Sequence, residues 1–390
     1  MLLRIFRTPQ VLKRKSTLAL SLSLVIFYLY QDFKNWPLMT FLKAQGPMTY
    51  VDSHTVLFYS RCFSQIGSDV FAADSICPNW GYGSGVLRFL SFFGTTEKDA
   101  ALFGHFFTYS LVITFVYLIY VTRSSKFVQA TLFMGLISPP VWLLMERANF
   151  DAIIYLIIFS AAVLIGKGYE AMPIVLIFIT TTFKFYTLPL LLICLMLCKK
   201  IPNKVLGILA LILGTILAFL DLNLMSVRLI QAGNNHFGMK IIGNYLGKIG
   251  FELDIISAYL LGAILLTICV WLIYYLLSRY ETTVLNTNLI PAKVRSLYLF
   301  MSSAHLICFI AGLSVDYRLI FFLVSAPILI GLLTSRMRYF LAGFFLISAW
   351  LSYPAGILQT IGDLALEIVS AAQIFFMIIY LIYVKKNLIR

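Results

Sequence analysis

The chain has 390 residues, of which 61% are hydrophobic and 12% are charged, and its formal net charge is +14. Soluble globular domains carry about 25% charged residues, so this composition excludes a soluble protein and predicts a polytopic membrane protein. The basic residues lie mainly in loops between apolar runs and form no soluble basic domain, so they indicate membrane topology and no nucleic-acid partner.

The apolar runs predict about a dozen membrane-spanning segments, since roughly 20 apolar residues cross a bilayer core. Each must be a helix, because a lipid-facing backbone has to satisfy its own hydrogen bonds. In chain order they cover residues 16–30, 100–121, 127–145, 151–166, 171–184, 187–198, 204–221, 255–277, 296–313, 317–334, 339–353 and 361–384. The segments at 171–184 and 187–198 are short, so full crossings, tilted helices and broken or re-entrant helices are alternatives there. The sequence therefore predicts an all-α fold with about 10 to 12 transmembrane helices in one integral membrane domain, residues 1–390.

Lysine and arginine concentrate in every second loop, which marks those loops as cytoplasmic. They precede the first span, as at Lys15, and follow the last span, as at Lys385. Both termini are therefore expected in the cytoplasm, with the protein in the plasma membrane, the inner membrane of a bacterium. The other loops, above all residues 31–99 and 222–254, are expected on the extracytoplasmic side and hold most of the carboxylates.

The turn at residues 146–151 is the first candidate for a functional site. Its sequence, ERANFD, places three ionisable side chains and an amide between two apolar runs. A charged side chain at the bilayer centre costs about 3 kcal/mol, so such a cluster predicts an interface or a cavity. Basic residues on the same predicted side break the topology pattern, among them Arg147, Lys184 and Arg318. Cations and carboxylates at one membrane face indicate a site that handles an anion and moves a proton.

Several short motifs follow one another in an order that is typical of a known enzyme family. They are Asp52 with VLFY at 56–59, GSDVF at 67–71, ERANFD at 146–151, KFYTLP at 184–189 and DYR at 316–318. Together they resemble the multi-pass glycosyltransferases of the GT-C superfamily, in particular the bacterial mannosyltransferase-like branch. Ala148 stands where that family usually has glycine, Thr187 stands where it has proline, and WGYG at 80–83 replaces a Tyr-Pro-like segment. Most of these motifs lie in roughly the first half of the chain. In the second half the resemblance is mainly in the hydropathy pattern.

The resemblance implies a membrane glycosyltransferase that transfers a sugar from a polyprenyl-phosphate donor to a glycan, lipid or protein acceptor outside the cytoplasm, surrounded by membrane lipid. A carboxylate suits the base that takes the proton of the acceptor, and Asp52 is the predicted base. The structural alternative is that Asp52 caps a helix beginning near Ser53, and the two roles are compatible. Two other functions remain as alternatives: a polysaccharide polymerase or ligase acting on polyprenyl-linked glycans, and a lipid-glycan flippase or transporter.

Four basic residues are predicted to bind the donor phosphate, because Arg meets phosphate with paired hydrogen bonds and Lys acts as a point charge. They are Arg147, Lys184, Lys240 and Arg318. Two structural alternatives stand beside this prediction. Lys184 would extend to the lipid headgroups from a helix end, and Arg147 would form an ordinary helical ion pair with Asp151, four residues away.

Five further residues are predicted to bind substrate: Asn149, Asp151, Tyr186, Asn235 and His236. Alternatively, Asn149 caps the helix that follows it, Asp151 braces Lys184, and the polar residues near 235 belong to ordinary loop structure. His54 and His105 are isolated in the sequence and are expected to be structural.

No cofactor is assigned from these motifs, and no metal site. A divalent cation stays open as an alternative, with Asp52 and either Asp69 or Asp74 as oxygen ligands. Cys62 and Cys77 share the predicted oxidising side, so a disulfide between them is also left open.

Overall fold

The computed structural model describes residues 10–35, 49–67, 84–122, 125–224, 236–237, 292–311, 314–333, 335–351 and 357–388, with six single positions between 257 and 271. Within these ranges the chain is helical apart from turns and one short pair of antiparallel strands, which confirms the helical class. The predicted span at residues 255–277 lies outside the described ranges except for those single positions.

The described helices follow the predicted segments closely in chain order. The α-helices are α1 (Gln10–Phe33), α3 (Val51–Ile66), α4 (Ser84–Phe92), α5 (Ala100–Val121), α6 (Lys126–Leu136), α7 (Pro139–Glu146), α8 (Asp151–Gly166), α9 (Ala171–Phe183), α10 (Leu190–Leu197), α11 (Ile201–Leu224), α14 (Ala292–Ala311), α15 (Ile320–Leu332), α16 (Ser335–Leu351) and α17 (Ile357–Leu388). Between them lie the 3₁₀ helices η3 (Glu97–Asp99), η4 (Phe185–Thr187) and η6 (Asp316–Leu319), and the strands β1 (His236–Phe237) and β2 (Ser314–Val315).

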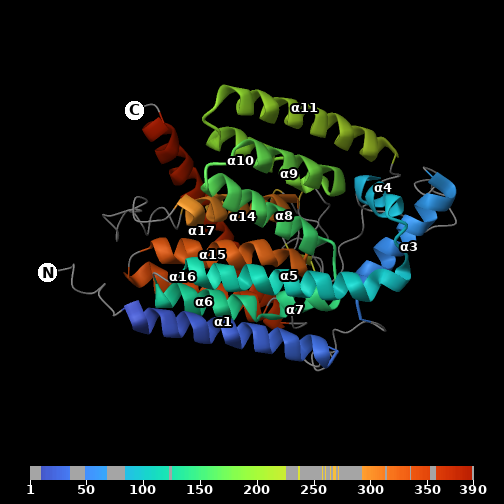
Figure 1. Ribbon diagram of the computed structural model, residues 1–390. Helices are drawn as coiled ribbons and strands as arrows, with labels where there is room; N and C mark the ends of the chain where they lie inside the picture. Colours follow the sequence, from blue (N-terminus) through green and yellow to red (C-terminus); the bar gives the residue numbers. More distant parts are fainter. Residues whose placement is uncertain are drawn as a thin grey trace.

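Most of these helices run side by side in a bundle, from α11 at the top of Figure 1 to α1 at the bottom. The short helix α4 and the helix α3 lie at one end of this bundle (Figure 1). The start of α1 and the end of α17 lie at the opposite end (Figure 1). The bundle therefore has two distinct ends, and the candidate site described below belongs to the end that carries α3.

Four helical segments of the described residues are long and apolar enough to cross a membrane: Lys15–Phe33, Glu97–Val121, Ile201–Asp221 and Leu358–Ile378. A fifth arises if α6 and α7, which are bent by 48° relative to each other, form one span. These segments support a multi-pass membrane protein. The remaining apolar helices of the described part are shorter, so length and composition support fewer crossings than the about 10 to 12 expected from hydropathy.

Prolines and a charged residue separate short helices in two parts of the chain. The segment at 127–145 consists of α6 and α7, because Pro139 and Pro140 begin α7 and have no N–H to continue the hydrogen bonding of α6. In the region 171–198, α9 and α10 are separated by Lys184 in an extended conformation and by η4. These two short apolar helices correspond to the two segments predicted at 171–184 and 187–198.

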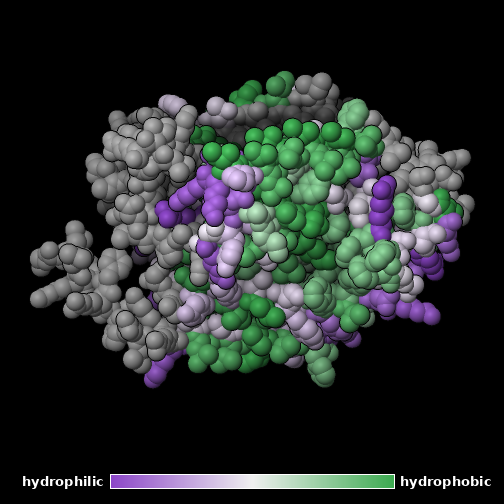
Figure 2. Space-filling model, turned by 45° about the horizontal axis from the view of Figure 1, so that its top comes forward, coloured by the Kyte–Doolittle hydropathy of each residue, from purple (hydrophilic) through white to green (hydrophobic). Residues whose placement is uncertain are grey.

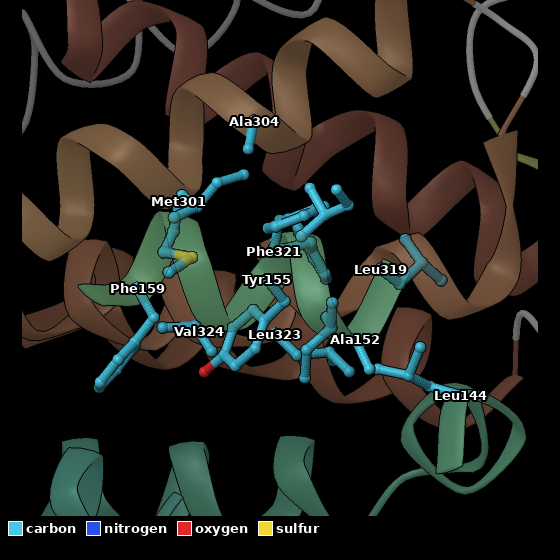
Figure 3. Packing of buried hydrophobic residues seen from close by; sticks show 14 of the residues in the cluster. Leu144, Ala152, Tyr155, Phe159, Met301, Ala304, Leu319, Phe321, Leu323 and Val324 are labelled. Carbon is cyan, nitrogen blue, oxygen red and sulfur yellow. The ribbon is translucent and has the colours of Figure 1, made fainter. Parts of the chain in front are cut away.

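Aromatic and aliphatic side chains of α8, α14 and α15 form the centre of the core. Tyr155 and Phe159 of α8, Met301 of α14, and Phe321 and Val324 of α15 pack in one buried cluster (Figure 3). The ring centroids of Tyr155 and Phe321 are 6.1 Å apart. Packing of this kind holds helices together in lipid, where the hydrophobic effect gives little drive for helix association. Helix α14 packs against both α8 and α15. The start of α8 and the segment that leads into α15 come to the same region, as the hydrogen bond from Arg318 to Asp151 shows.

The molecule has a broad hydrophobic face with hydrophilic atoms on either side of it (Figure 2). Helix α11 has a largely exposed apolar surface, and it is fastened at both ends. At its start, the Asn203 amide (2.9 Å) and the Lys200 N–H (3.1 Å) donate to Glu170 and hold the pKa of that carboxyl below its usual value. At its end, Asp221 accepts from the N–H and the hydroxyl of Ser84, at 2.9 and 2.6 Å. Since Ser84 begins α4, this contact fixes α4 against the bundle.

Candidate active site

The turn between α7 and α8 carries the candidate site. Ala148 in this turn is completely buried and has a φ of 47°, in the left-handed region that glycine adopts most readily. This conformation breaks the helix between α7 and α8, so Arg147 and Asp151 do not share one helical face. A left-handed non-glycine residue costs on the order of 1–2 kcal/mol, which the contacts around the turn must offset.

The start of α3 docks onto this turn through hydrogen bonds to three successive carbonyl oxygens. The bonds are Tyr50 N to Glu146 O (2.8 Å), Asp52 N to Arg147 O (3.1 Å) and Ser53 Oγ to Ala148 O (2.6 Å). Tyr50 itself is left-handed, with φ 60°, and stands at the N-cap of α3. The docking places the first turn of α3, and with it the Asp52 carboxylate, against residues that lie far away in the sequence.

The Asp52 carboxylate accepts three hydrogen bonds at this junction. Arg147 donates to Oδ1 from Nε (3.0 Å) and from Nη2 (2.5 Å), and Asn149 Nδ2 donates to Oδ2 at 2.6 Å. Two of the structural alternatives are therefore wrong. Asp52 does not cap α3, because Tyr50 is the N-cap and the carboxylate is engaged by Arg147 and Asn149. Arg147 pairs with Asp52 and not with Asp151, because the turn separates them.

A second carboxylate, Asp151, begins α8 and is completely buried. Lys184 Nζ lies 2.7 Å from its Oδ1, the Tyr186 hydroxyl donates to the same oxygen at 2.8 Å, and Arg318 Nε donates to Oδ2 at 3.0 Å. The Arg318 guanidinium also lies over the Tyr186 ring, 5.2 Å from its centroid. Lys184 does not extend to the headgroups, because its side chain points inward and is only 5% exposed. Asp151 therefore braces Lys184, which is one of the two roles that the sequence left open for Asp151.

Asn149 connects the two carboxylates. Its Oδ1 accepts from the Asp151 N–H at 2.8 Å while its Nδ2 donates to Asp52, so it both supports the start of α8 and orients Asp52. The connected set is called the central cluster below: Asp52, Arg147, Asn149, Asp151, Lys184, Tyr186 and Arg318. Its ion pairs join three cations to two carboxylates. Cations gathered in one place favour an anionic ligand.

An apolar hollow borders the central cluster. It is small, with a volume of about 10 Å³, and is lined by Val86 of α4, Phe150 and Ile154 at the start of α8, and Phe183 and Lys184 at the end of α9. A group that reached it would meet both a cation and an apolar wall. The fixing of α4 by Asp221 therefore contributes one wall of this hollow.

The other predicted residues are placed in part or lie outside the described residues. Asn235 and Lys240 are outside them, and so are Asp69 and Asp74, the partners considered for a divalent cation. His236 is described by its backbone, which pairs with Val315 in the antiparallel strands β1 and β2. This pairing places His236 and Phe237 next to the segment that leads into η6. Within the part of the chain that is described, no cluster of metal-binding side chains occurs.

Cys62 of α3 is disulfide-bonded. The structure therefore has a disulfide at Cys62, whereas Cys77, the partner considered from the sequence, lies outside the described residues. Cys194, Cys198 and Cys308 are buried and take part in no disulfide.

Two features near the central cluster were not assigned a role from the sequence. Glu146 is completely buried, and neither oxygen of its carboxyl group has a hydrogen-bond partner among the described residues. Asp32, at the end of α1, accepts from the Tyr50 hydroxyl (2.7 Å) and the Tyr109 hydroxyl (3.1 Å) and lies 2.9 Å from His105 Nδ1. His105 is therefore not isolated, and it supports Tyr50. The charge of Glu146 beside an apolar run is the one sequence signal for these features. The contacts of Asp32 join segments 73 residues apart, so no local pattern predicts them.

Gly104 of α5 tests this support, because Tyr50 packs directly on it. A Cβ at position 104 would lie 2.5 Å from ring atoms of Tyr50. We expect Gly104→Ala to displace Tyr50 and to lower stability by about 1–3 kcal/mol, as overpacking does. Thermal unfolding of the purified protein measures this. Gly343→Ala is the matched control, because a Cβ there meets no atom within 4 Å and alanine favours the helix α16. Equal midpoints for the two variants would contradict the prediction.

Comparisons with protein-family models, with curated proteins and with solved structures find no match to this chain. The chemistry of the central cluster is therefore the basis for assigning a function. It combines a partly exposed carboxylate, three cations, and a small apolar hollow at its border.

Proposed function

We propose that the protein is a membrane glycosyltransferase that transfers one sugar from a polyprenyl-phosphate donor to a glycan, lipid or protein acceptor. The observation that carries this proposal is the hydrogen-bonded connection from Asp52 through Asn149 to the Asp151 cations, beside an apolar hollow. One end of this arrangement suits a base, the cations suit a phosphate, and the apolar side chains that line the hollow suit contact with lipid.

In the proposed reaction the acceptor hydroxyl oxygen attacks the anomeric carbon of the donor. The bond from that carbon to the phosphate oxygen breaks, the polyprenyl phosphate leaves, and the hydroxyl proton passes to Asp52. Cations held in place before the reaction stabilise the charge that grows on the leaving phosphate. Arg147 and Arg318 are the cations best placed to meet it, with side chains 33% and 17% exposed, and Lys184 lies deeper in the cluster.

The proposal includes a GT-C-like architecture with about 10 to 12 membrane helices, both termini in the cytoplasm of a plasma-membrane protein, and the site outside. Two observations support this orientation. The start of α1 and the end of α17 lie at the bundle end opposite to α3 (Figure 1). The disulfide-bonded Cys62 of α3 suits an oxidising compartment.

A lipid-glycan transporter is the second candidate, because α17 carries ionisable residues inside the bundle. Asp363 and Glu367 of α17 are buried, and Ser370 of the same helix lies 2.9 Å from His305 Nε2 of α14. Buried ionisable residues within membrane helices often mark a transport pathway. This candidate predicts movement of a lipid-linked glycan without cleavage of its phosphate bond.

A transfer assay with purified protein distinguishes these functions. Polyprenyl-phosphate sugars are offered with candidate acceptors, and glycosylated product and released polyprenyl phosphate are both quantified. We expect equal amounts of the two. A polymerase or ligase would require a polyprenyl-linked glycan as the donor and would transfer its glycan, and a transporter would release no polyprenyl phosphate. Running the assay with and without a chelator decides whether a divalent cation takes part.

A further inference from the structure

We propose that Arg147 is a latch that holds Asp52 in an inactive arrangement until a lipid phosphate draws the guanidinium away. This inference rests on the proposed function, and it adds an order of events: the donor binds first, and its phosphate makes the base available. The argument depends on how completely Asp52 is engaged and on which cation is easiest to release.

Oδ1 of Asp52 is not available as a base in the arrangement that the structure has. A carboxylate offers about four acceptor positions, and three are occupied here, two by Arg147 and one by Asn149. Oδ1 in particular receives both Arg147 hydrogen bonds. An acceptor hydroxyl must come within hydrogen-bond reach of a carboxylate oxygen before its proton can be transferred. Arg147 therefore has to leave Oδ1 before that oxygen can receive the proton.

Arg147 is also the cation that an incoming phosphate can recruit most readily. Its side chain is 33% exposed, whereas those of Arg318 and Lys184 are 17% and 5% exposed. Arg318 and Lys184 both compensate Asp151, which is completely buried, and removing either would leave a buried carboxylate poorly paired. Asp52 is partly exposed, so losing its pair is less costly. Arginine also meets phosphate with two parallel hydrogen bonds, which makes phosphate a strong competitor for it.

The exchange requires only the side chain of Arg147 to move. Its carbonyl oxygen stays bonded to the Asp52 N–H at 3.1 Å, so the turn and the start of α3 remain docked. Asn149 keeps its hydrogen bond to Oδ2 of Asp52 and keeps the carboxylate oriented. After the exchange Oδ1 faces the acceptor, and Arg147 neutralises the phosphate that will leave.

Competition of this kind has a consequence that is measurable without any transfer reaction. If Asp52 and a phosphate compete for Arg147, removing the charge of Asp52 must strengthen phosphate binding, and the coupling is reciprocal. If Asp52 did not compete for Arg147, removing its charge would give no gain in phosphate affinity that depends on Arg147. The Asp52→Asn variant therefore reports on the latch, and an Arg147→Met background reports whether Arg147 carries the effect.

The experiment measures binding of polyprenyl monophosphate to the full-length protein in detergent, for the wild type, Asp52→Asn, Arg147→Met and the double variant. We expect Asp52→Asn to tighten binding by about 5- to 20-fold, within the usual range of coupling between sites. We expect Arg147→Met to weaken binding by about 10-fold or more, as the loss of a charged hydrogen-bonding partner does. In the Arg147→Met background, Asp52→Asn should change the affinity by less than about twofold, since a coupling that depends on Arg147 is removed with it.

Glu97→Gln is the matched control, because Glu97 pairs with the exposed Arg61 at 2.9 Å on the same end of the molecule. It removes a carboxylate from an arginine in the same way and should leave lipid-phosphate affinity unchanged. Thermal unfolding of every variant shows that it is folded, and Arg147→Gln, which also removes the charge but keeps a polar side chain, replaces Arg147→Met if that variant is not folded.

Each outcome decides a different point. Equal tightening by Asp52→Asn with and without Arg147, or no tightening at all, overturns the latch while the proposed function stands. If Asp52→Asn tightens lipid-phosphate binding through Arg147 but no assay detects sugar transfer, the proposed function is overturned. The exchange of Arg147 between the Asp52 carboxylate and a phosphate then still holds. Failure of the wild type to bind polyprenyl phosphate overturns both.

Discussion

Asp52→Asn is expected to lower the turnover number of sugar transfer by about 10²- to 10⁴-fold, the usual contribution of a general base. The asparagine keeps the size of the side chain and can still accept a hydrogen bond from Asn149, so the fold of the turn should survive. It cannot take up the proton of the acceptor. The measurement is the rate of product formation at saturating donor and acceptor, together with thermal unfolding of the variant.

Glu97→Gln provides the comparison for this experiment, because it makes the same chemical change at a carboxylate that pairs with Arg61 outside the central cluster. Its turnover should match that of the wild type. If Asp52→Asn transfers sugar as fast as Glu97→Gln, another group takes the proton. Glu146, buried beside Arg147 in sequence, would then be the next carboxyl group to replace.

Asp151→Ala is expected to destabilise the protein by about 3–5 kcal/mol, the usual cost of breaking a buried ion pair from one side. Asp151 is completely buried and compensates two cations, Lys184 at 2.7 Å and Arg318 at 3.0 Å. Without it both cations are left in a low-dielectric environment, and the Tyr186 hydroxyl loses the oxygen to which it donates. The free energy of unfolding, measured by denaturant titration in micelles, tests this.

The exposed pair of Glu97 and Arg61 is the control for stability as well. Glu97→Ala breaks an ion pair of similar length at the surface, where such pairs contribute about 0–1 kcal/mol. A second variant, Asp151→Leu with Lys184→Met, removes charges of both signs and should recover part of the loss, because paired buried charges can be replaced by apolar groups. Losses of the same size for Asp151→Ala and Glu97→Ala would show that the cluster does not depend on Asp151 for its stability.

Helix positions in this chain follow from local properties of the sequence. The predicted segments at 100–121 and 151–166 coincide with α5 (Ala100–Val121) and α8 (Asp151–Gly166), because each is an uninterrupted apolar run between polar residues. The break between α6 and α7 shows the limit of this reasoning. Hydropathy continues across Pro139 and Pro140, and only the missing N–H groups divide the run, so counting apolar residues overestimates the length of the span.

The composition of the central cluster was also predictable, but its pairing was not. Charges in apolar runs cost free energy, so Arg147, Asp151 and Lys184 indicated a site without any coordinates. Their partners depend on the docking of α3 and on the packing of α14 between α8 and α15. Arg147 and Asp52 are 95 residues apart, and Arg318 and Asp151 are 167 residues apart.

The sequence by itself determined that the chain is helical with apolar segments long enough to cross a membrane, and which charged residues are unsuited to face lipid, because both properties depend on local transfer free energies. The tertiary structure decided which cation neutralises which carboxylate. Arg147 pairs with the partly exposed Asp52, and Lys184 and Arg318 pair with the buried Asp151. The physical reason is that an ion pair forms between groups brought within a few ångströms by packing of distant segments, and local sequence carries no record of that distance.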